Sequence, residues 1–504
     1  MSTSTDRVPS PAVAAGAETV AAPDPRRWAA LVVIAIAQLM IVLDGTIVNI
    51  ALPTMQKALH ISDVNKQWVI TAYALAFGAF LLLGGRIADY TGRRRAFIIG
   101  LLGFAAASAL GGAAVNQAML YGARGLQGVF GALMAPAALS LLTVTFTEEK
   151  ERARAFGVYG AIAGGGTAIG LIMGGVLTEY ASWRWTLLVN VPIAILAAFA
   201  ASRYLNESKA EGDTKYDIPG ALTSTAGLAA LVYGFNKANT DGWSSATTLS
   251  LLGAGVALLV AFILIEVRTS HPLLPMRVIL DRNRGGSFLS SLLMGVGLFG
   301  VFIFLTYYMQ QILGYSALKS GFAFLPFTFA VVAGAGVATR FLPAIGPRVL
   351  MFVGFALATV GMVLFTRIGV DTSYLTHVVP AEAIMAFGVG LFFVPLSSTA
   401  LIGVADHDAG VASALVNTTQ QIGGALGTAM LVTFATTATT NYLGSHASPT
   451  ANPQVLGAHA AVHGYIVAFV WSAAILAIAA LVVGVLVKAR KSDLPAGGAA
   501  VHVG

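Results

Sequence analysis

The feature that most constrains this chain is a succession of long apolar segments separated by short polar ones. A helix that crosses a bilayer needs about 20 mainly apolar residues, because hydrocarbon offers the backbone no hydrogen-bonding partner. Only 10% of the 504 residues are charged, whereas soluble proteins have about 25%. We therefore predict an all-α integral membrane protein with fourteen transmembrane helices, approximately at 28–53, 66–84, 96–115, 118–146, 154–178, 185–203, 217–236, 246–267, 284–312, 318–340, 348–369, 376–402, 410–436 and 463–488.

A short charged segment indicates how these helices are oriented. It runs from Gly84 to Arg95, reads GGRIADYTGRRR and contains four arginines. Lys and Arg in short loops stay on the cytoplasmic side of a membrane. With the N-terminus inside, 22 of the 29 Lys and Arg residues fall in the tails and inner connections, and 6 fall in outer connections. We therefore predict an even number of helices and two cytoplasmic termini.

The charged segment has a faint counterpart in the second half of the chain. The sequences LLLGGRIADYTGRRRAFIIGLLG and VAGAGVATRFLPAIGPRVLMFVG share an order of apolar, glycine and basic residues. If these loops are equivalent, they divide the helices into groups of six, two and six. The predicted parts are a disordered cytoplasmic tail (1–27), a six-helix bundle (28–203), a linker with two extra helices (204–283), a second six-helix bundle (284–488) and a cytoplasmic tail (489–504). The longest outer connection is expected at about 437–463.

Several functions are disfavoured by what the sequence lacks. It has no cysteine, and we find no HExxH motif, no paired DxxD and no phosphate-binding Gly-Lys-Ser/Thr motif. We therefore expect no metal, no cofactor and no ATP. The net charge of +7 reflects helix orientation and anionic lipid, not nucleic acid. The acids expected at the inner surface are scattered, at Glu148, Glu149, Glu151 and Asp217.

Two acidic residues within predicted helices, Asp44 and Glu382, are candidate functional sites. A charged side chain in a span costs about 3 kcal/mol or more and is functional by default. Asp44 lies in the stretch LDGTIVNIALP, and Glu382 lies near the start of the segment 376–402. At a rise of about 1.5 Å per residue, Arg124 of the fourth helix reaches a depth similar to that of Asp44. An Asp44–Arg124 pair is therefore geometrically possible.

Four motifs, in this order along the chain, resemble the fourteen-helix drug:proton antiporter branch of the major facilitator superfamily. They are LDGTIVNIALP, GGRIADYTGRRR, YGARGLQGVFGALMAP and GGGTAIGLIMGG. The resemblance extends from Trp28 to about Val487. It implies a major-facilitator fold, in which two six-helix bundles rock around a central substrate site.

The resemblance implies that the charged segment is a conformational latch. Its residues are Gly85, Asp89, Gly92, Arg93 and Arg94. The second copy of the loop lacks the acid, so we expect a one-sided latch in which Asp89 contacts the other bundle. Tyr90 stands where the family has a basic residue, which weakens the expected latch. The alternative is a loop that only sets the topology.

The resemblance also implies that Asp44 is a proton or substrate-cation site, with Arg124 and Gln127 on the fourth helix. Protonation of Asp44 would weaken its pair with Arg124 and act as a coupling switch. Glu382 is a second candidate site. The alternatives are an Asp44 that merely caps or snorkels near the outer mouth, an Arg124 that is satisfied by backbone carbonyls, and an exposed Glu382 at a helix start.

The remaining motif residues fall into two groups. The antiporter-motif glycines are Gly166, Gly170, Gly174 and Gly175, where small residues allow close helix packing. Leu171 replaces the proline that the family has after Gly170, which puts the usual bend in doubt. The cavity candidates are Asn49, Gln127, Tyr307, Tyr308, Gln310, Gln311, Asn417 and Gln421. For the tyrosines and glutamines at 307–311, an aromatic belt at the outer surface is the alternative.

We predict a multi-pass protein of the cell membrane that is not an enzyme. It would export small lipophilic or amphipathic compounds, such as drugs, in exchange for protons. The alternatives are a dedicated exporter of an endogenous metabolite, siderophore or lipid intermediate and, less favoured, a membrane enzyme that transfers a lipid-linked group. The expected partners are a small-molecule substrate, protons and membrane lipid, without nucleic acid or ATP, and the expected state is a monomer.

Overall fold

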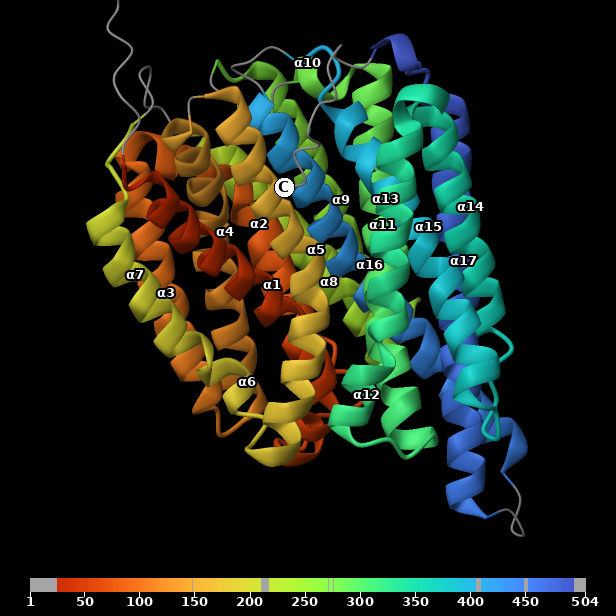
Figure 1. The fold of residues 1–504 in the computed structure, drawn as a ribbon. Helices are drawn as coiled ribbons and strands as arrows, with labels where there is room; N and C mark the ends of the chain where they lie inside the picture. Colours follow the sequence, from red (N-terminus) through yellow and green to blue (C-terminus); the bar gives the residue numbers. More distant parts are fainter. Residues whose placement is uncertain are drawn as a thin grey trace, which may run out of the picture.

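The predicted all-α architecture is present in the computed structural model, which describes residues 25–146, 148–209, 217–270, 272–274, 276–404, 409–447 and 452–493. Within these ranges the chain forms helices and no β-strand. Figure 1 shows long helices that run side by side, with α10 at one end of the molecule and α6 and α12 at the other. The tails predicted at 1–27 and 489–504 lie largely outside the described residues.

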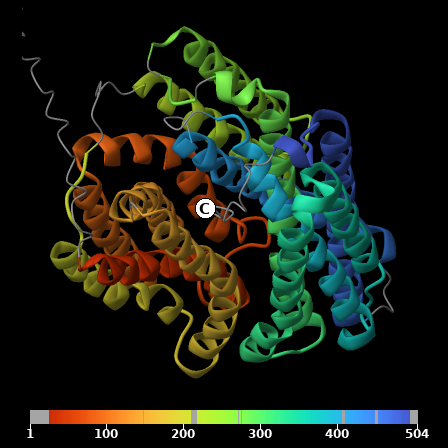
Figure 2. The same ribbon diagram turned by 45° about the horizontal axis from the view of Figure 1, so that its top comes forward.

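The N-terminal bundle is made of α1 to α7. These helices are α1 (Arg27–Ala58), α2 (Trp68–Thr91), α3 (Arg93–Gly112), α4 (Gln117–Thr145), α5 (Glu149–Tyr180), α6 (Trp185–Leu188) and α7 (Asn190–Tyr204). The linker contributes α8 (Ile218–Asp241), α9 (Ala246–Arg268) and the short α10 (Met276–Ile279). Figure 2 shows α8 and α9 side by side at the periphery, and α8 packs against both α2 and α16.

The C-terminal bundle is made of α11 to α17. Its helices are α11 (Arg282–Tyr307), α12 (Ala317–Ala323), α13 (Leu325–Ile345), α14 (Pro347–Phe365), α15 (Val379–Ala400), α16 (Ala409–His446) and α17 (Pro453–Leu486). Single π-helical turns follow α11 (Tyr308–Ile312) and precede α15 (Tyr374–Val378), and a 3₁₀ turn (Lys491–Asp493) follows α17.

Twelve described helices are long and apolar enough to cross a membrane. A thirteenth is obtained if the two parts of α2, Trp68–Leu81 and Leu83–Thr91, form one bent span. The helix α5 occupies the place of the remaining predicted span, and several of its side chains lie outside the described residues. The structure is therefore compatible with fourteen spans, and the exact number stays a prediction.

The two loops that the sequence predicts to be equivalent share an unusual backbone geometry. Gly92 separates α2 from α3 with φ 117°, and Gly346 separates α13 from α14 with φ 87°. Glycine adopts such angles without a steric penalty, because it lacks a Cβ atom. The common turn supports the internal repeat, in which α2–α3 of one bundle corresponds to α13–α14 of the other.

The long outer connection expected at 437–463 is wrong, because most of it is helical. The helix α16 continues to His446 and α17 begins at Pro453. The stretch is rich in alanine, the strongest helix former. Asn452 caps α17 by accepting a hydrogen bond from the backbone N–H of Gln454 at 2.9 Å. These helices therefore extend beyond the spans that hydropathy predicted.

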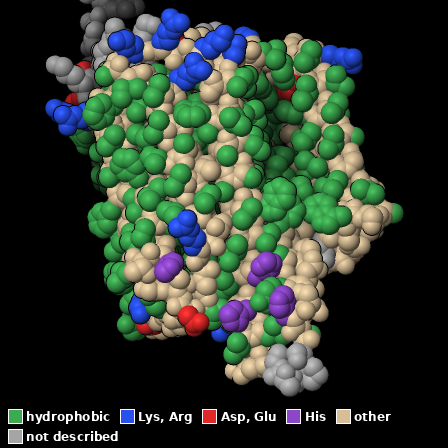
Figure 3. All heavy atoms as spheres, turned by 90° about the vertical axis from the view of Figure 1, so that its right-hand side faces the viewer, with side chains coloured by type: hydrophobic (Ala, Val, Ile, Leu, Met, Phe, Trp, Pro, Cys, Tyr) green, Lys and Arg blue, Asp and Glu red, His purple; other side chains and the backbone are tan. Residues whose placement is uncertain are grey.

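The two bundles are joined at their outer ends. Three hydrogen bonds between described residues connect them, and all lie where the chain leaves or enters the outer side. They join Tyr307 to Gln56, Gln310 to Ile50 and Leu318 to Glu179. Figure 3 shows Lys and Arg side chains gathered at the opposite end, which the charge count assigns to the cytoplasm, and histidines toward the outer end. The two bundles are thus in direct contact at the end that is predicted to be the outer one.

Candidate functional site

Asp44 lies within α1 and has no solvent-exposed surface (0%). Its Oδ2 accepts a hydrogen bond from Nη1 of Arg124 at 2.6 Å. Its Oδ1 accepts hydrogen bonds from Nε2 of Gln127 and Nδ2 of Asn190, each at 2.9 Å. A buried carboxylate is tolerated only when such donors compensate its lost hydration. The predicted Asp44–Arg124 pair is therefore confirmed as a structural feature.

Arg124, on α4, is buried to the same degree (1% exposed). Its Nε donates to the backbone carbonyl of Val69 at 2.9 Å, and its Nη1 also donates to Oε1 of Gln127 at 2.9 Å. The guanidinium lies 4.6 Å from the ring centroid of Tyr73, which is a cation–π contact. Both sequence-based alternatives hold in part, because Arg124 binds an acid and a backbone carbonyl together.

Sequence reasoning missed three members of this cluster: Ser108, Tyr73 and Asn190. The Oγ of Ser108 on α3 accepts a hydrogen bond from Nε2 of Gln127 at 2.7 Å. Asn190 is the first residue of α7, where the break from α6 at Val189 places it. A polar side chain in hydrocarbon is costly unless it is bonded. That cost is the signal that could have drawn attention to Asn190.

Within this cluster, Asp44 can lose its negative charge by binding a proton. The guanidinium of Arg124 stays protonated at any physiological pH. A proton on Asp44 would neutralise the carboxylate and weaken the charge-assisted hydrogen bond to Arg124. Because α1, α2, α3, α4 and α7 all contribute to this network, a change in the charge of Asp44 would act on the packing of these helices.

Glu382 lies in the first turn of α15, in the other bundle, and is 1% exposed. Its Oε1 receives no hydrogen bond from any described residue. The backbone of Phe327, near the start of α13, faces the carboxyl group. The alternative of an exposed helix-start glutamate is therefore wrong. The structure does not bring Glu382 into the Asp44 cluster.

Tyr307 and Tyr308 are buried, so the belt alternative is wrong for these two residues. The hydroxyl of Tyr307 donates to Oε1 of Gln56, and the Lys66 ammonium lies 3.9 Å from the Tyr307 ring centroid. Burial lowers the pKa of Lys66, and the nearby Asp63 carboxylate opposes this effect. The hydroxyl of Tyr308 donates to the carbonyl of Gly369 at 2.9 Å. Tyr307 thus belongs to the contact between the two bundles.

The other cavity candidates are dispersed. Gln310 donates through Nε2 to the carbonyl of Ile50 at 3.0 Å, whereas its neighbour Gln311 is exposed. Asn49 donates to the carbonyl of Gly45 in its own helix at 3.1 Å. Asn417 and Gln421 are half-buried on α16. Among the cavity candidates, only Gln127 has a hydrogen bond to a member of the Asp44 cluster within the described residues.

The latch residues form contacts within the N-terminal bundle and its following linker. The Nε of Arg93 donates to Oδ1 of Asp89 at 2.8 Å. The backbone N–H of Arg94 donates to Oε1 of Glu207 at 3.0 Å. Gly92 has φ 117°, a backbone conformation that residues with a side chain rarely adopt. The expected contact of Asp89 with the other bundle concerns a form closed on the inner side and stays a prediction.

Tyr90 and Leu171, the two residues that depart from the family pattern, both make defined contacts. Tyr90 accepts a hydrogen bond on its hydroxyl from Nη1 of Arg86 at 3.3 Å, and Gly85 lies beside Pro136 of α4. Leu171 is buried in α5, and a Cβ on Gly321 of α12 would be 2.6 Å from its carbonyl oxygen. Leu171 therefore lies where the two bundles touch.

The glycines of α5 provide close approach on two faces. A Cβ at Gly166 would be 2.9 Å from Val42 of α1, and one at Gly174 would be 2.7 Å from the carbonyl oxygen of Ile47. Gly170 faces the same helix. Gly175 instead faces α12, where a Cβ would be 2.6 Å from the Cα of Leu318. The motif thus packs α5 against its own bundle and against the opposite one.

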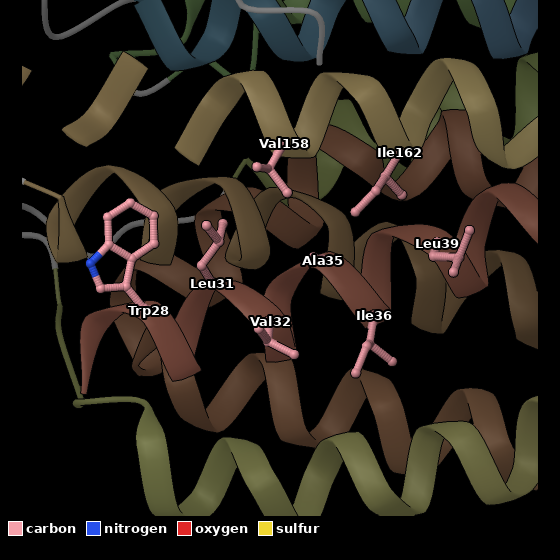
Figure 4. A pocket seen from close by; sticks show the side chains of 8 residues that line it. All are labelled: Trp28, Leu31, Val32, Ala35, Ile36, Leu39, Val158 and Ile162. Atoms are coloured by element: carbon pink, nitrogen blue, oxygen red, sulfur yellow. The ribbon is translucent and has the colours of Figure 1, made fainter. Parts of the chain in front are cut away.

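An open apolar groove of about 390 Å³ lies between α1 and α5 (Figure 4). All its walls are hydrocarbon or indole, and it lies on the cytoplasmic side of Asp44 along α1. The lining residues are Trp28, Leu31, Val32, Ala35, Ile36, Leu39, Val158 and Ile162. Such a lining accepts lipophilic groups and offers them no hydrogen bond.

The chain has extensive similarity to named bacterial proteins. It is 50% identical over 472 residues to the puromycin resistance protein pur8 of Streptomyces alboniger, covering 93% of each chain. It is 39% identical over 408 residues to the cephamycin export protein CmcT of Amycolatopsis lactamdurans, covering 80% of this chain and 84% of that one. It is 31% identical to the multidrug resistance protein Stp of Mycobacterium tuberculosis, over 78% and 73% of the two chains.

The fold is also found in a solved structure. A bacterial homologue of the human lysosomal transporter Spinster, in an inward-facing and unoccupied conformation, aligns with a TM-score of 0.64 at 15% identity, over 94% of this chain and 100% of that one. Residues 34–428 match the Major Facilitator Superfamily. The membrane-spanning helices, the paired charges inside them and these similarities agree, and the chain belongs to the Major Facilitator Superfamily of multi-pass membrane transporters of small molecules.

Proposed function

We propose that this transporter exports small lipophilic or amphipathic compounds, antibiotics among them, in exchange for protons. The observation that carries the proposal is the buried Asp44–Arg124 pair, whose carboxylate is bonded by three donors within the membrane part of the fold. Structural stability alone is a weak reason to keep a buried ion pair, because well-packed apolar residues often serve as well or better. The similarity to resistance and export proteins supports the same function.

The transport cycle we propose is a rocking of 28–203 against 284–488. The hydrogen bonds between the outer ends of the bundles support a form that is closed outside and receives substrate from the cytoplasm or the inner leaflet. The apolar groove between α1 and α5 supports a preference for lipophilic compounds. In the opposite form, Asp89 would contact the C-terminal bundle and close the inner side.

We place the coupling step at Asp44. A proton arriving from outside would bind its carboxylate, free Arg124 from its strongest partner and lower the affinity for a cationic substrate. Release of the proton to the cytoplasm would restore the pair. Glu382, the buried acid of the other bundle, is the candidate for a second proton. We further propose that the chain acts as a monomer in lipid and without ATP.

A dedicated exporter of one metabolite is the second candidate. The observation that favours it is the 39% identity to a protein named for cephamycin export. A broad range of unrelated compounds transported at comparable rates would exclude this second candidate.

The test is transport in proteoliposomes with an imposed pH gradient. Puromycin, a cephamycin and a set of lipophilic cations are the substrates. We expect the native protein to transport at least one of them faster when the gradient drives protons in the opposite direction. The Asp44→Asn variant keeps the hydrogen-bonding shape of the side chain, and we expect it to lose the response to the gradient.

The matched control is Asp371→Asn, which changes an exposed acid of the outer surface. We expect this variant to retain gradient-driven transport. Native transport that ignores the pH gradient would exclude proton exchange. Normal gradient-driven transport by Asp44→Asn would exclude the role assigned to Asp44.

A further inference from the structure

A pair of buried acids lies at the end of the two extra helices that is predicted to be cytoplasmic. Asp217 directly precedes α8 and is 5% exposed, and Glu266 lies in the last turn of α9 and is 2% exposed. The sequence-based expectation that Asp217 is one of several scattered acids is wrong. The antiparallel return of α9 along α8 brings the two carboxyl groups together.

Each carboxyl group binds the backbone through one oxygen. Oδ1 of Asp217 accepts a hydrogen bond from the backbone N–H of Gly220 at 2.8 Å, and Oε2 of Glu266 accepts one from Leu274 at 2.9 Å. The other two oxygens face a common point, because a Cβ on Gly220 would be 2.5 Å from Oδ2 of Asp217 and 2.8 Å from Oε1 of Glu266. The two carboxyl groups therefore lie close together, on the same side of Gly220.

The two facing oxygens both lack a hydrogen-bond donor among the described residues. Neither Oδ2 of Asp217 nor Oε1 of Glu266 receives a hydrogen bond from any described residue. Two ionised carboxylates in one buried site repel each other, and the usual solution is that they share a proton. A proton between the two oxygens gives each of them a partner and removes the repulsion.

The charged surroundings do not remove the need for this proton. From α2, Arg86 acts on Glu266 electrostatically. Its guanidinium, however, donates to the hydroxyl of Tyr90 and to the backbone carbonyl of Pro272, at 3.3 and 3.4 Å. The other charged group that acts on Glu266 is Asp217, at the start of α8. His271 lies outside the described residues.

We propose that Asp217 and Glu266 bind one proton from the cytoplasmic side, and that this proton fastens Leu274, between α9 and α10, to the start of α8. Glu266 accepts a hydrogen bond from the backbone N–H of Leu274. Two residues earlier, the backbone carbonyl of Pro272 accepts one from Arg86 of the charged segment. Loss of the proton sets two negative charges face to face and loosens Leu274 and Pro272. Cytoplasmic pH would thereby control the contact between the extra helices and the loop of α2.

The first test is infrared spectroscopy of the purified full chain, across a pH titration. A protonated carboxylic acid has its own carbonyl stretching band, which disappears on ionisation. We expect the native protein to have such a band, and Asp217→Asn and Glu266→Gln each to lose that same band. A band that persists in both variants, or two different bands lost in the two variants, would overturn the proposal.

The second test is hydrogen exchange of the backbone at 272–280, corrected for the intrinsic effect of pH. We expect exchange in the native protein to accelerate as the pair loses its proton. Asp217→Asn and Glu266→Gln place an amide N–H where the proton was, so we expect their corrected exchange to be independent of pH. Asp241→Asn, at the other end of α8 from Asp217, is the matched control and should behave like the native protein.

Two outcomes would contradict the idea directly. One is the same pH dependence in both amide variants as in the native protein. The other is a loss of the infrared band when Na⁺ or Mg²⁺ is added at constant pH, which would make the pair a cation site. Neither measurement uses transport, so they can fail or succeed independently of the proposed exporter function.

Discussion

At the scale of single residues, Arg124 and Asp44 compensate each other's charge and form a hydrogen bond inside the membrane part of the protein. Arg124 donates to Asp44, Gln127 and the carbonyl of Val69, while Asp44 also accepts from Asn190. Desolvation makes either charge costly without the other. Removing one member of the pair and removing both should therefore have different consequences.

The variant Arg124→Met tests this dependence. We expect it to lower the free energy of unfolding by about 3–5 kcal/mol, because the buried Asp44 carboxylate loses its countercharge. Combining it with Asp44→Asn should recover part of that loss, since no buried charge remains unpaired. The measurement is unfolding of the purified protein in detergent. A double variant no more stable than Arg124→Met alone would show that the charge of Asp44 is not the cause.

At the scale of helices, α5 depends on glycine where it crosses α1. We expect Gly174→Ala to lower the free energy of unfolding by about 1–3 kcal/mol, because the added methyl group would press against the backbone carbonyl of Ile47. The control is Gly122→Ala on α4, where no atom lies within 4 Å of the added carbon. That change should be neutral or stabilising by up to about 1 kcal/mol. Equal effects in detergent unfolding experiments would contradict the packing role.

Helix boundaries differ in how readily the sequence reveals them. The start of α17 has a recognisable signal, because Asn452 is a capping residue and Pro453 occupies the first turn. Hydropathy missed it, since that part of the helix extends beyond the predicted span. The break between α6 and α7 at Val189 has a weaker signal, although it decides where Asn190 lies. Local pattern alone does not predict this break.

At the scale of the whole molecule, the contact of α2 with α16 links the two bundles. A Cβ at Gly78 would be 3.1 Å from the Cβ of Gln421, close to the roughly 3.5–4.5 Å between Cβ atoms in a disulfide. The chain has no cysteine of its own. We expect the double variant Gly78→Cys/Gln421→Cys to form a disulfide on oxidation and to stop transporting, because the bundles can no longer rock. Reduction should restore transport.

The corresponding controls are the two single-cysteine variants, whose transport should be the same under oxidation as after reduction. The extent of cross-linking can be followed by labelling free thiols before and after reduction. Full transport by a completely cross-linked protein would contradict rocking of 28–203 against 284–488.

The sequence by itself determined the helical class and the membrane location, and it indicated that Asp44 and Arg124 could pair; the orientation of the termini and the roles of the two residues stay predictions. Lipid makes this possible, because each span must satisfy its backbone within one helix and each charge within it is costly. Only the tertiary structure decided that Asn190 and Ser108 complete the cluster, that Glu382 stays apart from it, and that Asp217 meets Glu266. The helices are apolar on most sides, so periodicity does not show which face turns inward. Those contacts depend on how distant helices rotate and pack against one another.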